Sequence, residues 1–337
     1  MNTIAVKGVI AWFLYHTGIT RRLSRGFKNS MIIAYHHVVP EYDDAISFLQ
    51  PGMYVTTKTF EKHLQYLRKN YHIIPLDKID GVHIENACVI TFDDGWADNF
   101  NHALPILRKY DAPATIFLST GFMDSYEWPW PDRVSYYAAY APETGFTEML
   151  RYLGHETGAS LPSGDMTDLR RSVAAEMCIA RMKREPHARL TEIMGHLDAL
   201  FKQQHEDLNT RRPWLTWDEV GEMDQAGISF GAHTHNHVIL TSCNPEKAEQ
   251  EIVTSKDMLS ERIGRPVRMF SFPNGDYHEK HVDVLKCHGF THAVTTRSGV
   301  IRSSEDLLTL RRFMLHDDMT KTIPMLTCKL AGSIPYF

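Results

Sequence analysis

The sequence lacks the cysteine pattern of a disulfide-bonded or thiolate-zinc protein. Its 337 residues include five cysteines, an odd number, and no two of them form a CxxC pair. Scattered thiols of this kind predict neither a disulfide framework nor a site in which cysteines hold zinc. They fit a reducing compartment best.

A surplus of positive charge is also absent. The chain carries 36 Lys and Arg against 41 Asp and Glu, for a formal net charge of -5, and it has no run of like charge that resembles a binding tail. Nucleic-acid-binding proteins concentrate basic residues on one surface, so nucleic acid is not an expected partner. With 43% hydrophobic and 11% aromatic residues, the chain can instead bury a sizeable core.

The N-terminal apolar stretch GVIAWFLY, at 8–15, is too short to span a bilayer, which needs about 20 residues. A secretory signal carries its basic residues ahead of the apolar run, whereas here they follow it. The first thirty residues contain no acidic group and five basic ones: Lys7, Arg21, Arg22, Arg25 and Lys28. We predict an amphipathic basic segment over 1–29, with Trp12, Phe13 and Leu14 toward lipid and the cations toward anionic headgroups. The alternative is an ordinary helix packed on the domain.

Apolar runs bounded by turn residues recur along both halves of the chain, and they are typical of buried strands. They lie at 31–38, 87–94, 114–120, 228–235, 269–273 and 292–296. Helical spacing of apolar residues separates the early runs, at 60–70 and 101–110. Strands that alternate with helices predict parallel βα units.

This alternation breaks after residue 121, and 123–212 reads as a mostly helical insertion without a strand signal. The βα pattern resumes at 214–227, where Thr216 followed by Glu219 predicts a capping box. The insertion is rich in aromatic residues, including Trp128, Trp130, Tyr136 and Tyr137. These rings either line a binding cleft or pack the core of the insertion itself.

Two adjacent carboxylates, Asp93 and Asp94, close the apolar run at 87–94. The carboxyl ends of parallel strands are where α/β enzymes assemble their sites. Neighbouring carboxylates repel each other unless a cation shares the site, and a divalent metal would meet that need. The alternative is that one aspartate caps the next helix while the other faces solvent.

Three histidines occupy five positions in GAHTHNH, namely His233, His235 and His237. A strand would place all three on one face, whereas a helical turn would align only the outer pair, so the spacing alone leaves the ligands open. Two imidazoles with one carboxylate form a ligand set used by catalytic zinc, which keeps a further position for water. A second aspartate is then free to act as general base.

These motifs resemble those of the polysaccharide deacetylase family, which includes the NodB-type chitooligosaccharide deacetylases. The family's TFDDG motif is present at 91–95, its H-(S/T)-x-x-H motif at 233–237 and its YHxV motif at 35–38. The resemblance covers about 30–122 and 213–318, with the motifs in the family's order. It implies an α/β fold, a distorted (β/α) barrel of the NodB type that carries the helical insertion.

The resemblance also implies the roles of the residues in these motifs. Asp93 corresponds to the catalytic base. Asp94, His233 and His237 correspond to the ligands of one divalent metal ion, which leaves His235 without a metal role. Zn²⁺ is the expected metal, with Co²⁺, Ni²⁺ or Mn²⁺ as alternatives.

One motif departs from the family pattern. Many members have R-x-x-P-(Y/F)-G, whose arginine orients the catalytic aspartate, whereas this chain has FSFPNG at 270–275, with Ser271 in the arginine's place. This form resembles the variant in the exopolysaccharide-processing branch. Arg312 is the candidate that orients Asp93 instead. The backbone N–H of Asn274 would still be available to an oxyanion, because that donation does not depend on the side chain.

The family's general acid is a histidine late in the domain, within an apolar-x-H pattern. Leu315 and His316 fit this pattern, with Asp317 or Asp318 nearby. His36 is the alternative. His316 could also be a solvated histidine in a polar loop.

The sequence therefore predicts a metal-dependent hydrolase that removes N-acetyl groups from GlcNAc-type amino sugars of a polysaccharide, oligosaccharide or lipid-linked saccharide. Two alternatives remain: an amidohydrolase that acts on a non-sugar amide, and a catalytically silent carbohydrate-binding domain. The expected domains are an amphipathic segment at 1–29, a barrel at 30–122 and 213–320, an insertion at 123–212 and a tail at 321–337.

The expected location follows from the N-terminus. With no convincing export signal and a basic amphipathic start, the chain is predicted to be cytoplasmic, with peripheral contact to the inner face of the membrane through residues 1–28. Secretion is the less expected outcome. A membrane-associated or nascent saccharide would suit this location better than a finished polymer outside the cell.

Overall fold

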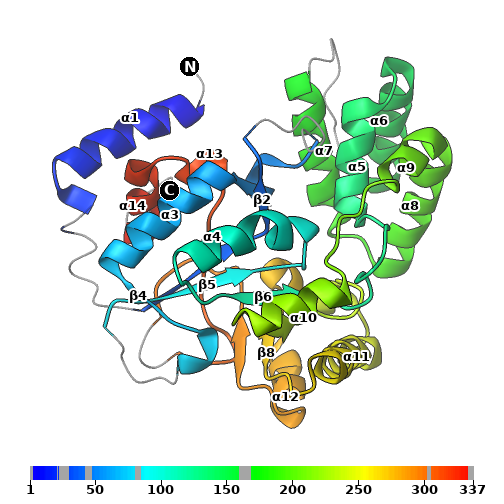
Figure 1. The fold of residues 1–337 in the computed structure, drawn as a ribbon. Coiled ribbons are helices and arrows are strands. Elements are labelled where there is room, and N and C mark those ends of the chain that lie inside the picture. The colour runs from blue at the N-terminus through cyan, green and yellow to red at the C-terminus, as the bar shows by residue number, and fades with distance from the viewer. Residues whose placement is uncertain are drawn as a thin grey trace.

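Parallel strands form the centre of the molecule (Figure 1). The structure, a computed structural model, describes residues 3–20, 22, 30–41, 48–79, 85–158, 168–301 and 305–332. Within these residues an eight-stranded sheet has the order β10-β1-β5-β6-β7-β8-β9, and β4 pairs with β5 beside this path. Its strands are β1 (Met31–Tyr35), β4 (His72–Ile73), β5 (Ala87–Phe92), β6 (Thr115–Leu118), β7 (Ser229–Ala232), β8 (Met269–Ser271), β9 (His292–Val294) and β10 (Phe313–Met314).

Pairing around Leu310 brings the two ends of this sheet together. β10 runs parallel to β1, with Ile33 opposite Phe313. Three residues before β10, Leu310 forms a parallel bridge with Val294 of β9. The result is the distorted (β/α) barrel that the sequence predicts, with the carboxyl ends of its parallel strands gathered at one rim.

The strands form where the sequence has continuous apolar runs. Every residue of β1, β5 and β6 is buried, as expected for parallel strands covered on both faces. Five helices lie between successive strands of the barrel, namely α3 (Thr57–Asn70), α4 (Leu104–Lys109), α10 (Trp217–Gln225), α11 (Pro245–Ile263) and α12 (Glu279–Cys287). The predicted capping box at the start of α10 is confirmed, because Thr216 and Glu219 each accept a hydrogen bond from the other's backbone N–H.

The insertion between β6 and β7 is helical throughout the part that the structure describes. It comprises α5 (Trp130–Tyr140), α6 (Glu143–Thr157), α7 (Asp168–Met182), α8 (His187–Leu200) and α9 (Lys202–Leu208). These helices gather on one side of the barrel (Figure 1). Trp128, Tyr136 and Tyr137 are buried in the hydrophobic core, and Trp130 packs against it. Of the two interpretations of these aromatic rings, packing is therefore the one that the structure supports.

Helices at the two ends of the chain pack on each other. α1 (Thr3–His16) lies against α14 (Ile323–Ala331), so the predicted tail at 321–337 contains a helix. Ala11 is buried against Met325 and Cys328, and Leu14 packs on the same small cluster. The prediction that Leu14 faces lipid is therefore wrong, because this side of α1 is covered by α14. Among the described residues, none of the helices is both long enough and apolar enough to span a bilayer.

A short two-stranded sheet, β2 (His37–Val39) with β3 (Tyr54–Thr56), lies beside the barrel rim. In the sequence, β2 follows β1 after a single residue. His36, the single residue between β1 and β2, is therefore held at the carboxyl end of β1, next to the end of β5 with which β1 pairs.

Candidate active site

The predicted site residues meet at the carboxyl rim of the barrel. Asp93 and Asp94 follow β5, His233 follows β7, and Ser271 is the last residue of β8. β6 pairs with both β5 and β7, so the first two groups are only two strands apart. Asp93, Asp94 and His233 are each buried.

Asp94, His233 and His237 form a compact cluster. The Nε2 atoms of His233 and His237 lie 3.3 Å and 3.2 Å from Oδ1 of Asp94. One potential ligand atom from each of the three residues falls within 4.8 Å of the others, the only such His, Cys, Asp and Glu grouping among the described residues. Although burial alone would raise it, the neighbouring His237 and His233 imidazoles hold the pKa of Asp94 well below its usual range.

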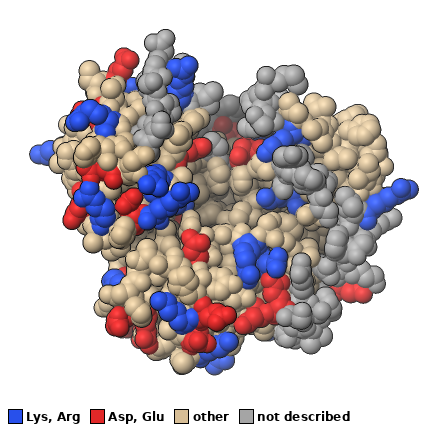
Figure 2. Space-filling view, turned by 180° about the vertical axis from the view of Figure 1, so that it is seen from behind, with Lys and Arg blue, Asp and Glu red and all other residues tan. Residues whose placement is uncertain are grey.

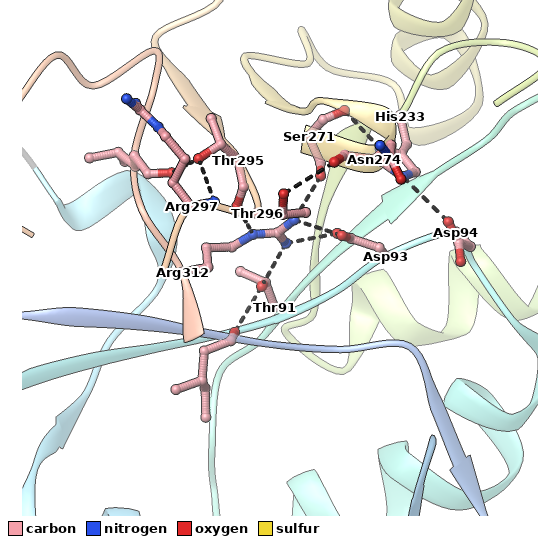
Figure 3. A network of polar contacts seen from close by, with 12 residues as sticks. Thr91, Asp93, Asp94, His233, Ser271, Asn274, Thr295, Thr296, Arg297 and Arg312 are labelled. Atoms are coloured by element: carbon pink, nitrogen blue, oxygen red, sulfur yellow. Dashed lines mark hydrogen bonds and ion pairs between the residues drawn. The ribbon is translucent and has the colours of Figure 1, made fainter. Parts of the chain in front are cut away.

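The polar atoms of this cluster fit a metal ion. Oδ1 of Asp94 is buried and has no hydrogen-bond partner among the described residues, whereas Oδ2 accepts from the Trp96 indole N–H at 2.9 Å. The Nδ1–H of His233 donates to the Ser271 carbonyl at 2.7 Å, so Nε2, which faces Asp94, is the nitrogen that keeps a lone pair for a metal (Figure 3). Fixing the tautomer through the other ring nitrogen is usual for metal-binding histidines. Two imidazole nitrogens and a carboxylate oxygen suit Zn²⁺ and neighbouring divalent ions.

His235 points elsewhere. Its Nδ1 lies 3.0 Å from the Thr120 hydroxyl, and its carbonyl accepts from the Gly121 N–H at 2.7 Å. The loop around it is anchored by Glu251 of α11, which accepts hydrogen bonds from the backbone and side chain of Asn236. The structure thus brings the outer two histidines to Asp94 and turns the middle one toward β6.

The backbone at the rim adopts unusual conformations. Asp94 has φ 76°, His237 has φ 51° and Asn274 has φ 58°, all in the left-handed region that non-glycine residues rarely occupy. Such conformations cost on the order of 1–3 kcal/mol each and cluster at functional sites. Their coincidence at three predicted site residues marks this rim as the functional end of the barrel.

Arg312, which directly precedes β10, binds Asp93 from two strands away in the sheet. Its Nη1 and Nη2 donate to the two carboxylate oxygens of Asp93 at 2.8 Å and 2.6 Å, and both side chains are buried (Figure 3). Thr91, Ser271 and the Thr295 carbonyl accept the remaining hydrogen bonds of the guanidinium. Although burial alone would raise it, the charge and hydrogen bonds of Arg312 lower the pKa of Asp93. Asp93 is therefore ionised and oriented, as a general base requires.

The two candidate proton donors occupy different surroundings. Burial lowers the pKa of His36, opposed by the charges of Asp94 and Asp93, so this imidazole lies within electrostatic reach of both carboxylates. His316, at the N-terminus of α13 (Asp317–Thr320), pairs through Nδ1 with Asp318. Of the two histidines, only His36 has a described interaction with Asp93 and Asp94.

A loop from the barrel and a lysine from the insertion meet next to this cluster. Asn274 lies in the turn after β8, where its side-chain N–H donates to Asp276 at 2.6 Å and its carbonyl accepts from the Thr296 hydroxyl at 3.1 Å. Lys183, just beyond α7, donates to the Asn274 side-chain oxygen at 2.9 Å. The insertion therefore contacts the loop that was predicted to supply an oxyanion donor.

Sequence reasoning missed several neighbours of the site. Trp96 follows TFDDG directly, and its indole N–H would have been a detectable partner for Asp94. His37 pairs with Asp98 at 2.6 Å, and burial raises the pKa of Asp132, in α5, to about 7. Asp132 and Lys183 lie in the insertion, outside any recognisable motif, so the sequence did not indicate that they lie near the site.

Enzymes that hydrolyse acyl bonds on a parallel barrel place their reacting groups at the carboxyl rim, and the fold and site put this chain in that class. It belongs to the polysaccharide deacetylase family, because the family model matches residues 81–293, more than half of the chain. It is accordingly a deacetylase, a hydrolase of acetylated carbohydrate. Among curated proteins, Bacillus subtilis YxkH, itself assigned to the polysaccharide deacetylases, is 21% identical over 273 residues, which cover 79% of this chain and 67% of YxkH.

Solved structures share the fold at low sequence identity. The Streptococcus pyogenes deacetylase PplD, determined with acetate, has a TM-score of 0.55 and 20% identity, covering 87% of this chain and 94% of PplD. IcaB from Ammonifex degensii has a TM-score of 0.56 and 16% identity, covering 89% of this chain and 97% of IcaB. These similarities confirm the barrel fold that the motifs predict.

Proposed function

We propose that the protein removes N-acetyl groups from GlcNAc-type saccharides and that Asp93 is its general base. The observation that carries this proposal is the bidentate ion pair between Arg312 and Asp93, next to the cluster of Asp94, His233 and His237. Arg312 fills the role of the arginine that is missing at position 271. A base held ionised beside a metal-binding cluster is what hydrolysis of an unactivated amide needs.

Asp94, His233 and His237 would hold a divalent ion, and Zn²⁺ suits this donor set best. When bound, such an ion polarises a carbonyl and makes water more acidic. Asp93 accepts the proton of the attacking water. Because Arg312 donates to both of its oxygens, Asp93 has one fixed orientation for that transfer.

His36 is the proton donor in this proposal. An amine is a poor leaving group unless it is protonated, so amide hydrolysis requires an acid as well as a base. His36 lies between β1 and β2 at the same rim and interacts electrostatically with both aspartates. His316 remains the alternative, with its pairing to Asp318 leaving Nε2 available.

The backbone N–H of Asn274 would donate to the oxyanion that develops during attack. Its left-handed conformation and the three polar contacts of this residue fix the turn after β8. Preorganised backbone donors of this kind stabilise developing charge without reorganising during the reaction.

A saccharide chain would enter along an open groove of about 950 Å³ that starts beside Asn274. The groove is lined by residues of the segment 275–280 together with Thr296 and Arg297. Tyr277 stacks on Phe272 with ring centroids 4.8 Å apart, which fixes an aromatic ring in its wall. Figure 2 shows Lys and Arg interspersed with Asp and Glu on one face of the molecule, with no wide field of either sign, so a neutral acetylated sugar suits this face better than a polyanion.

The test is acetate release from β-linked GlcNAc oligomers by metal-loaded protein, compared with Asp93→Asn and with an O-acetylated sugar. We expect release from the N-acetylated oligomers and its loss in the variant. A silent carbohydrate-binding domain would bind these oligomers without releasing acetate. A non-sugar amidohydrolase would release acetate from small acetamides but would not prefer oligomers over them. Equal turnover by Asp93→Asn would contradict the role of the base.

A further inference from the structure

The face of α1 that points away from the protein is apolar. Val9 is 69% exposed, and Trp12 and Phe13 are each 58% exposed. At about 100° per residue, these three side chains and His16 lie within an arc of about 100° around the helix. The Trp12 and His16 rings contact each other with centroids 4.5 Å apart, so two of the rings in this arc form one surface.

The opposite face of α1 fixes the helix in place. Ala11 is fully buried against α14, Leu14 packs beside it, and Lys7 donates to the Met319 sulfur at 3.2 Å. A helix on the surface of a soluble domain normally turns its apolar stripe inward and its polar residues outward. α1 departs from this arrangement, because Lys7 faces the protein while Val9, Trp12 and Phe13 face away from it.

The charge of this region selects lipid as the partner. The first thirty residues carry five basic groups and no acidic one, and Arg22 follows the helix within the described residues. A Trp and a Phe beside Lys and Arg form the pattern of helices that lie in the interface of anionic membranes. At 14 residues, α1 is about 21 Å long, which is too short to cross a bilayer upright.

We propose that α1 docks the protein on an anionic lipid surface through Val9, Trp12 and Phe13. Docking would bury these side chains at the level of the headgroups while the basic residues attract anionic lipids. α1 lies on the opposite side of the barrel from the insertion in Figure 1, so the insertion stays clear of this surface. This proposal stands on α1 alone and is independent of the proposed activity.

Co-sedimentation of the full chain with vesicles tests it. We expect binding to vesicles of 70% phosphatidylcholine and 30% phosphatidylglycerol, weaker binding to pure phosphatidylcholine, and a decrease with added salt. The triple variant Val9→Ser, Trp12→Ser and Phe13→Ser should bind at least tenfold more weakly. As a matched control, Tyr126→Ser removes another exposed aromatic ring, which lies at the start of the insertion and is 52% exposed, and this variant should bind like the wild type.

Circular dichroism of the triple variant shows whether it is folded, and light scattering gives its oligomeric state. If the folded triple variant bound anionic vesicles as tightly as the wild type, or the wild type did not bind them, the proposal would be overturned. A wild-type dimer that becomes monomeric in the triple variant would also overturn it, because a second copy would then be what covers this face.

Discussion

Arg312 holds both carboxylate oxygens of Asp93 although the two residues are 219 positions apart in the chain. Arg312 also donates to the Ser271 hydroxyl at 3.1 Å, at the position where many relatives carry the orienting arginine. The small serine leaves room for a guanidinium that comes from just before β10. The same contact to the base is therefore made from a different strand.

Replacing Arg312 should impair catalysis through Asp93. Without the guanidinium the pKa of Asp93 should rise, so the acidic limb of the pH–rate profile should move to higher pH. Arg312→Lys keeps the charge but loses the paired geometry, and we expect it to lower kcat/KM roughly a hundredfold. Arg311→Lys is the matched control, because Arg311 pairs with Glu305 and not with the base. A wild-type pH profile for folded Arg312→Lys would contradict this role.

Metal binding should distinguish the three histidines of GAHTHNH. His233→Ala and His237→Ala each remove a nitrogen that faces Asp94, so each should lose bound metal after dialysis, as measured by elemental analysis. His235→Ala should retain it, because this ring contacts Thr120 instead. Chelation should likewise abolish acetate release and lower Tm, since a ligand that binds only the folded state stabilises it. Loss of metal in His235→Ala with retention in His237→Ala would reverse the assignment.

The barrel, and the place of several polar residues at its rim, could be predicted from the sequence because both depend on short local patterns. Apolar runs mark buried strands, and polar residues directly after them, as in TFDDG, fall at the rim of a parallel sheet. Asp93, Asp94 and His233 could be placed at the rim in this way, whereas their roles were implied by the resemblance to the family. β10 was not among the predicted strands, because its two residues are too few to give a periodic signal.

Contacts between distant segments explain what the sequence could not show. Whether Leu14 faces lipid or protein depends on where α14 packs, and a 14-residue helix that is apolar on several sides does not reveal its covered face. The approach of Lys183 to Asn274 depends on how the insertion sits on the barrel. Neither Leu14 nor Lys183 belongs to a sequence pattern that indicates its contact, so only the three-dimensional structure identifies its partner.

Substrates with different leaving groups should identify the proton donor. If His36 protonates the departing amine, His36→Gln should lose most of its activity on N-acetylated sugars but keep much more of it on p-nitrophenyl acetate, whose leaving group needs no proton. His316→Gln should change neither rate by more than a few-fold. The reverse pattern, with only His316→Gln showing this selectivity, would assign the acid to His316.

Acid should destabilise the fold partly through His63 of α3. Burial lowers the pKa of His63 to about 4, and its ring lies 2.7 Å from the Thr320 carbonyl and 3.1 Å from the Tyr35 hydroxyl. In the unfolded chain the pKa of this histidine is about 6.5. Neutral His63 therefore supports the full free energy of unfolding above pH 6.5, and this free energy decreases by about 3 kcal/mol as the pH falls toward 4. Denaturant unfolding from pH 7 to 4.5 should show a shallower loss of stability in His63→Gln than in the wild type. Parallel curves would contradict the prediction.

The contact between Lys183 and Asn274 should affect turnover more than substrate binding. Lys183 donates to the side chain of Asn274, whose backbone N–H is the proposed oxyanion donor. Asn274 has a strained left-handed conformation, so we expect the turn to change its conformation when this contact is lost. Lys183→Met should therefore lower kcat roughly tenfold with little change in KM. A full loss of an oxyanion donor costs about a hundredfold or more, and here the donor is loosened but not removed.

Conservative replacement separates this positioning role from a direct contact with sugar. Lys183→Arg keeps a donor that can reach Asn274, so it should recover much of the lost kcat. The control is Lys202→Met, which removes another lysine of the insertion. Lys202 lies 3.9 Å from the Glu206 carboxylate, and its replacement should change neither kcat nor KM. If Lys183 bound the saccharide itself, Lys183→Met would raise KM at constant kcat. That result would leave Asn274 positioned by Asp276 and Thr296 alone, and would assign the insertion to substrate binding instead of to the reacting geometry.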